Sequence, residues 1–178
     1  MLEGGPLPEL GMESLIECTA WQRDRWHDWF RTHPGTLRTD TGTHVAGGFA
    51  TLGDLTRHVF TVERRYVQRL NGQALSDFAD VSPDDVEALF AAGRASRSAL
   101  RLLITSFAGD WDADRHLAIP AYADLTATPR KIVLHVLVHE IRHWAQIATL
   151  CRIHGQAIEA QDVLPSPVLG GTFSPRAR

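Results

Sequence analysis

Three histidines at four-residue intervals are the residues of this sequence best suited to chemistry. His135, His139 and His143 lie in an otherwise apolar stretch. Each four-residue step advances about 40° around a helix axis, so on a helix the three imidazoles form one gently winding stripe. Buried imidazoles cost free energy unless they have partners, and a metal ion supplies partners. With nine histidines in 178 residues, a chance triple at this spacing is expected only about 0.02 times, so the pattern favours a metal site.

A further ligand should come from another part of the chain, because one helix usually directs two successive histidines at one ion. His58 is the best candidate, since it alone among the other histidines lies on the inner stripe of a second long predicted helix. A lone histidine on such a stripe is more often a core residue with hydrogen-bond partners, and that interpretation stays open. Three neutral imidazoles leave a coordination position free, which is typical of a catalytic metal rather than a structural one.

The segment His139–His143 also matches HExxH, the zinc-peptidase signature in which Glu140 would be the general base. Such peptidases need another ligand, but Gln146 and Thr149 stand where the metzincin pattern has glycine and histidine. Arg142 places a charge between the two histidines, and Glu140 lies about 100° from His139 around a helix. The peptidase interpretation is therefore the weaker one.

Apolar residues recur with the period of amphipathic helices in four segments, and no segment has a sustained period of two. The predicted helices span about 13–32, 51–71, 82–108 and 128–155. Their expected starts are Thr51 with Asp54, Ser82 with Pro83, and Thr128 with Pro129. Arg97 falls on the inner stripe of the third helix. The fourth helix is apolar almost all the way around, which predicts a buried helix.

These elements predict an all-α protein, a four-helix bundle. Connections of roughly 10 to 20 residues are long enough for a crossover between parallel neighbours. We expect an N-terminal tail over 1–12, the bundle over 13–155, and a C-terminal tail over 156–178 that wraps the surface or is partly disordered. The segment 117–122 could form a short hairpin arm.

Composition excludes several classes of protein. A net charge of -3 and a pI near 6.3 disfavour binding to nucleic acid or to an anionic membrane surface. The start of the chain lacks the features of a signal peptide, and no apolar run is long enough to span a bilayer. Cys18 and Cys151 are expected to be reduced core thiols, so the predicted compartment is the cytoplasm.

Two segments of the sequence resemble helices of the DinB/YfiT-like family. The run Leu52–Phe60, followed by Glu63–Tyr66, resembles the second helix of that family, and the run His135–Ile147 with Leu150 and Gly155 resembles its last helix. Order, spacing and helix number agree over about residues 13 to 164. The resemblance implies an up-down-down-up four-helix bundle, often a homodimer, that binds one divalent metal ion through three histidines.

By position, the resemblance assigns His58, His139 and His143 as the metal ligands. It places His135 and Gln146 beside the site, and Glu63 matches a frequent family glutamate, although a salt bridge to an arginine explains Glu63 equally well. The family commonly has arginine and glycine where this chain has Trp144 and Ala145, so an anion contact made by its relatives is in doubt and Trp144 is expected to pack in the core.

The resemblance implies a divalent-metal-dependent enzyme that transfers a low-molecular-weight thiol to an electrophilic small molecule, in detoxification or stress response. The ion would be zinc, nickel, iron or manganese, all of which accept nitrogen ligands. One alternative is a hydrolase that uses metal-bound hydroxide. Another is a non-catalytic, stress-induced metal-binding or scaffold protein in which the histidines only hold the bundle together.

Overall fold

A computed structural model describes residues 11–42, 47–77, 79–119, 125–159 and 162–171. Long helices dominate this part of the chain: α1 (Met12–Thr32), α2 (Leu52–Leu70), α3 (Val86–Ser106) and α4 (Pro129–Ile153). A short 3-10 helix, η1 (Pro34–Arg38), follows α1, and the antiparallel strands β1 (Arg115–His116) and β2 (Thr126–Ala127) precede α4. The prediction of an all-α four-helix bundle is confirmed. None of the described helices is long and apolar enough to cross a lipid bilayer.

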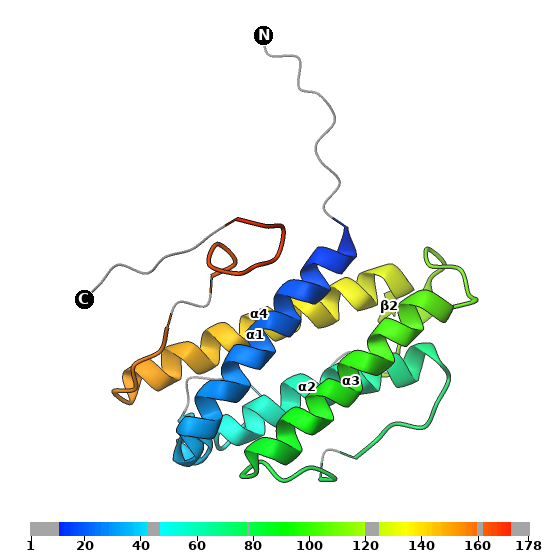
Figure 1. Cartoon of the computed structure of the whole chain (residues 1–178). Helices are drawn as coiled ribbons and strands as arrows, with labels where there is room; N and C mark the ends of the chain where they lie inside the picture. The colour runs from blue at the N-terminus through cyan, green and yellow to red at the C-terminus, as the bar shows by residue number, and fades with distance from the viewer. Residues whose placement is uncertain (1–10, 43–46, 78, 120–124, 160–161, 172–178) are drawn as a thin grey trace.

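The helices have the up-down-down-up arrangement (Figure 1). α2 and α3 run in the same direction, because the start of α2 at Gly53 lies against Pro83, and Gly93 of α3 lies against Phe60 further along α2. The segment between α2 and α3 is therefore a crossover that returns the chain to the same end of the bundle. α1 and α4 run in the opposite direction to this pair (Figure 1).

Two of the three predicted helix starts agree with the structure. Thr51 and Asp54 form a reciprocal capping box at α2, and the Thr128 hydroxyl accepts a hydrogen bond from the Lys131 N–H at α4. The start of α3 was predicted wrongly, because its cap is Asp85, whose side chain accepts from the Ala88 N–H at 3.0 Å.

Close packing against α2 explains the later start of α3. A Cβ placed on Gly53 would lie 2.1 Å from the Pro83 carbonyl oxygen, so the backbone before α3 is pressed against α2 at this point. The Ser82 hydroxyl accepts only a local hydrogen bond from the Asp84 N–H, at 3.3 Å. The proline therefore belongs to the connection, and the helix begins beyond it.

Aromatic side chains fill the core at one end of the bundle. Trp144 is completely buried, stacks on Trp26 with ring centroids 5.5 Å apart, and meets the edge of Phe60 at 5.9 Å. This confirms the expectation that Trp144 packs in the core.

The prediction that α4 is buried on all sides was wrong. Leu134 and Val138 are 45% and 42% exposed, respectively. Each helix of a four-helix bundle has an outer face, and α4 carries apolar residues on that face as well as on its inner one.

The segment before α4 also differs in detail from the expected arm. β1 and β2 pair with each other and flank this segment in the sequence. The Leu117 N–H donates a hydrogen bond to the Leu125 carbonyl at 2.8 Å. Part of the predicted hairpin, residues 120–122, lies outside the described residues.

Candidate metal centre

Three histidines from two helices meet at one point between α2 and α4. His139 Nε2 lies 3.1 Å from His58 Nε2 and 3.0 Å from His143 Nε2. One ring nitrogen from each of the three lies within 4.8 Å of the others. His58 on α2 faces the two successive turns of α4 that carry His139 and His143, and the three imidazoles therefore converge.

The spacing of these nitrogens is close to that around a divalent ion. Metal–nitrogen bonds of about 2.0–2.1 Å place adjacent ligand nitrogens about 3.3–3.4 Å apart in a tetrahedral site and about 2.9 Å apart in an octahedral one. The separations of 3.1 and 3.0 Å lie between these two values. Three imidazoles suit zinc, nickel, iron or manganese, and they leave coordination positions for a further ligand.

A hydrogen bond to Gln146 sets the protonation of one of the three histidines. His143 Nδ1 lies 2.6 Å from the Gln146 side-chain oxygen, which only accepts hydrogen bonds. The proton of the neutral ring therefore sits on Nδ1, and Nε2 presents its lone pair to the other two histidines. Partners of this kind orient metal-binding histidines and fix their tautomer. Gln146 thus lies beside the histidine cluster.

The histidines are held in the neutral form that binds metals. Burial, and then the nearby His143, lower the pKa of His58 to about 4. Burial is also the largest cause of the lowered pKa of His139, about 3, with His143 next. Burial lowers the pKa of His143 as well, although its hydrogen bond to Gln146 opposes the change. At neutral pH none of the three needs to lose a proton before it binds an ion.

Aromatic rings flank the site on two sides. The ring of Phe49 lies 4.5 Å from that of His58 and 6.4 Å from that of His143, between centroids. On the other side His135 lies 5.6 Å from His139 and 5.4 Å from Tyr66. His135 is therefore a neighbour of the three clustered histidines and is not a member of that cluster.

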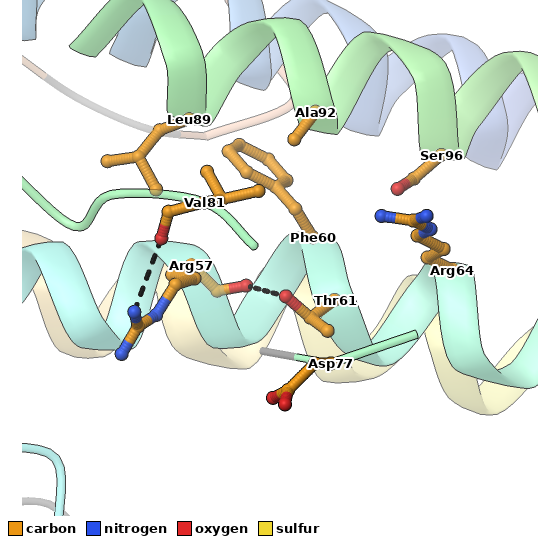
Figure 2. Close-up of a pocket in the computed structure, with 9 residues that line it drawn as sticks. All are labelled: Arg57, Phe60, Thr61, Arg64, Asp77, Val81, Leu89, Ala92 and Ser96. Atoms are coloured by element: carbon orange, nitrogen blue, oxygen red, sulfur yellow. Dashed lines mark hydrogen bonds between the residues drawn. The ribbon is translucent and has the colours of Figure 1, made fainter. Parts of the chain in front are cut away.

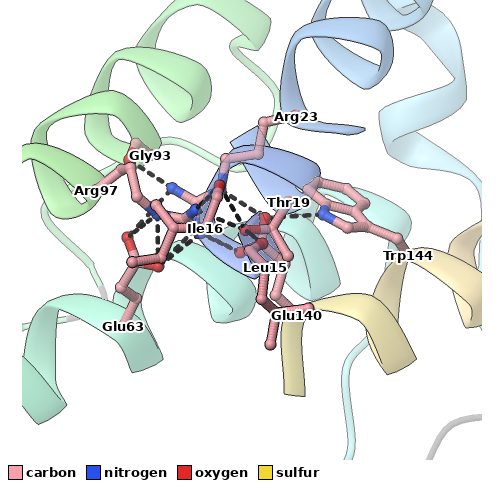
Figure 3. Close-up of polar contacts among 9 residues, drawn as sticks. All are labelled: Leu15, Ile16, Thr19, Arg23, Glu63, Gly93, Arg97, Glu140 and Trp144. Carbon is pink, nitrogen blue, oxygen red and sulfur yellow. Dashed lines mark hydrogen bonds and ion pairs between the residues drawn. The ribbon is translucent and has the colours of Figure 1, made fainter. Parts of the chain in front are cut away.

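Glu63 lies in a buried ion-pair cluster at the centre of the bundle, in keeping with the salt bridge to an arginine that its sequence position left open. One charged residue comes from each helix: Arg23 of α1, Glu63 of α2, Arg97 of α3 and Glu140 of α4 (Figure 3). Arg23 bridges both carboxylates, with 2.8 Å to Glu63 and 2.5 Å to Glu140. Helical geometry explains the location of Glu63, since a residue five positions after His58 points about 140° away from it.

The same cluster removes Glu140 from any role as a general base. Glu140 is 1% exposed, and its carboxylate accepts hydrogen bonds from Arg23, Arg97 and the Trp144 indole N–H. A carboxylate held in this way faces the bundle interior rather than the open side of the histidines. The peptidase interpretation of HExxH therefore has no support in the geometry.

The burial of Arg23 and Arg97 was not predicted from the sequence. A signal was present, since Arg97 already fell on an apolar stripe, and a charge there needs a buried partner of opposite sign. What the sequence could not show is which carboxylates those partners are, because the four residues are far apart along the chain.

A narrow cavity between α2 and α3 is not a second candidate for a substrate site. Its lining includes Arg57 and Phe60 of α2, Val81 of the connection, and Ser96 of α3 (Figure 2). Its volume of about 10 Å³ is too small for anything larger than a water molecule.

One comparison with known proteins identifies a family for this chain. The family model described as the DinB family matches residues 10–167, which includes all four helices and the three histidines. A search of curated proteins found no match.

Proposed function

The chain belongs to the DinB family, and from this premise we propose that it is a divalent-metal-dependent enzyme that transfers a low-molecular-weight thiol to an electrophilic small molecule. Such a reaction would serve detoxification or a stress response. The observation that supports the proposal most is the convergence of three neutral imidazole nitrogens from α2 and α4. A set of three protein ligands with an open position is the arrangement of catalytic metals.

The residues around the histidines have separate tasks in this proposal. His58, His139 and His143 hold the ion, and Gln146 keeps the ring of His143 in the required tautomer. Phe49 covers the flank of His58 and limits the access of water from that side. When bound, the ion lowers the pKa of a thiol at its open position and so supplies a thiolate near neutral pH.

The transfer balances without a further reagent. The thiol gives up its proton to solvent, and its sulfur forms a bond to the electrophilic carbon. The bond from that carbon to the leaving group breaks, and the leaving group departs with the electron pair. No group is oxidised or reduced, so a metal ion without redox activity is sufficient.

Elemental analysis of the purified protein tests the metal site first. We expect close to one divalent ion per chain in the wild type and a large loss in His143→Ala. His135→Ala is the matched control, because His135 is on the same helix and touches His139 without joining the ligand cluster. Retention of the ion by His143→Ala, or equal loss in both variants, would contradict the ligand assignment.

Turnover of 1-chloro-2,4-dinitrobenzene with a panel of small thiols tests the reaction. We expect release of chloride and formation of the thioether to require a thiol, the metal and His143. Release of dinitrophenol without any thiol would instead support the hydrolase alternative. Absence of turnover, together with a large fall in melting temperature on metal removal, would support the non-catalytic alternative.

We also propose that the protein forms a homodimer. The exposed apolar residues Leu134 and Val138 on the outer face of α4 support this, since a second copy of the chain would remove them from water. Light scattering after size-exclusion chromatography should give about twice the 19.7 kDa mass of the chain. A monomer at micromolar concentration would contradict the proposal.

A further inference from the structure

A second cavity lies next to the histidine cluster, towards the N-terminal end of α4. Its volume is about 200 Å³. Leu117 and Leu125 from the two-stranded arm and Ile132 from α4 form apolar walls. Tyr66, Lys131 and His135 contribute the polar groups.

The cavity adjoins the candidate metal centre at His135. This residue lines the cavity, and its ring lies 5.6 Å from the ring of His139. One helical turn, about 5.4 Å, separates the two residues along α4. A molecule whose reactive atom lies at the histidines can therefore extend past His135 and place its remaining part in the cavity.

The charges around the cavity favour an anion. Among the described residues that line it none is acidic, whereas Lys131, the only lysine of the chain, contributes a positive charge at its exposed rim. A second positive charge is close, since the Arg69 guanidinium lies 5.5 Å from the centre of the Tyr66 ring. An ammonium group beside apolar walls binds a molecule that has both an apolar body and an anionic group.

The volume of the cavity is sufficient for an apolar body of about one ring. Apolar cavities of roughly 150 Å³ bind benzene, and the present cavity is slightly larger. Tyr66 and His135 both present ring systems to this space, and aromatic ligands pack well against such rings.

We propose that this cavity binds the non-reacting part of the substrate, and that this part is a small aromatic carboxylate or a similar organic anion. Its ring contacts Leu117, Leu125 and Ile132, and its carboxylate lies at Lys131. The role of this contact in turnover rests on the proposed function, whereas the binding itself does not require the metal.

Benzoate is a suitable probe, with benzyl alcohol as its uncharged analogue. In a titration followed by two-dimensional NMR, we expect benzoate to shift the amide signals of Ala127, Ile132 and His135.

Lys131→Gln should weaken the binding of benzoate by about tenfold, as for the loss of a charge-assisted contact. Arg130→Gln is the matched control, since it removes the same charge one residue away, from a side chain that pairs with Asp112 outside the cavity. Benzyl alcohol should bind the wild type as weakly as benzoate binds Lys131→Gln.

A second variant tests the position of the ring. Ala127 is 7% exposed and lines the cavity, so Ala127→Leu should fill the space and abolish binding of both probes. If this variant fails to fold, the comparison of Lys131→Gln with Arg130→Gln decides alone. Equal affinities in those two variants, or shifts that map elsewhere, would overturn the proposal.

The same titration on His143→Ala separates this inference from the proposed function. Unchanged benzoate binding by that variant supports the cavity even if the metal assignment or the thiol reaction fails. Loss of benzoate binding in a folded His143→Ala protein would overturn the cavity as a separate binding site.

Discussion

Replacement of Glu140 by glutamine would test whether the buried ion-pair cluster stabilises the bundle. Glutamine has nearly the same shape but no charge, so the change leaves the packing of α4 intact. In the wild type the carboxylate accepts from Arg23 at 2.5 and 2.8 Å, from Arg97 at 2.6 Å and from Trp144 at 3.0 Å. Without it, two buried guanidinium groups share the single carboxylate of Glu63.

The expected loss of stability is large. Removal of one partner from a buried ion pair costs about 3–5 kcal/mol, because the remaining charge is left without compensation. Small domains have only about 5–15 kcal/mol of total stability. With a urea dependence of about 2 kcal/mol per molar, a loss of about 4 kcal/mol lowers the urea midpoint by roughly 2 M.

Urea unfolding, followed by circular dichroism and tryptophan fluorescence, measures this loss at pH 7. Asp112→Asn is the control, because the Arg130–Asp112 pair has side chains 63% and 69% exposed and water already solvates both charges. We expect the control to unfold at nearly the wild-type midpoint. A Glu140→Gln protein as stable as Asp112→Asn would refute the argument that the cluster stabilises the fold.

The difference between wild type and Glu140→Gln should also depend on pH. Burial alone raises the pKa of Glu140, but the charges of Arg23 and Arg97 outweigh it and hold the pKa below its ordinary value. A carboxylate with a lowered folded-state pKa contributes stability that is complete above its unfolded-state pKa of about 4.3 and is lost as the pH falls through the folded-state pKa. The two urea midpoints should therefore approach each other in acid. A constant gap from pH 7 to pH 2 would contradict this assignment of the charge.

Three further predictions concern other parts of the bundle. Gln146→Met removes the acceptor that fixes the His143 tautomer, so chelator competition should show metal affinity reduced about 10- to 100-fold. Burial raises the pKa of Cys151 to about 12 and also raises that of Cys18, so neither thiol should react with a disulfide reagent at pH 8 until urea unfolds the chain; rapid reaction of the folded protein would contradict this. Gly53→Ala places a Cβ 2.1 Å from a backbone oxygen, and overpacking of this kind costs about 1–3 kcal/mol, visible as a lower urea midpoint; an unchanged midpoint would show that the two segments separate easily.

The sequence by itself determined the presence of the four helices and the relative placement of two of the three clustered histidines. The starts of α2 and α4 were predictable, because capping by Thr51 and Thr128 depends only on residues within one turn. The placement of His139 and His143 on one face of α4 follows in the same way from helical geometry. The start of α3 was not predictable from such local signals, since contact with Gly53 keeps Pro83 outside the helix.

The tertiary structure alone decided which distant residues meet. His58 and His139 are 81 residues apart in the sequence, and their contact at 3.1 Å depends on α2 and α4 running antiparallel at one particular register. The same register sends Glu63 and Glu140 into the interior, where Arg23 and Arg97 neutralise them. The helical period shows which face of a helix a side chain occupies. Which residue it contacts there depends on how the helices pack, because the contacting residues are far apart along the chain.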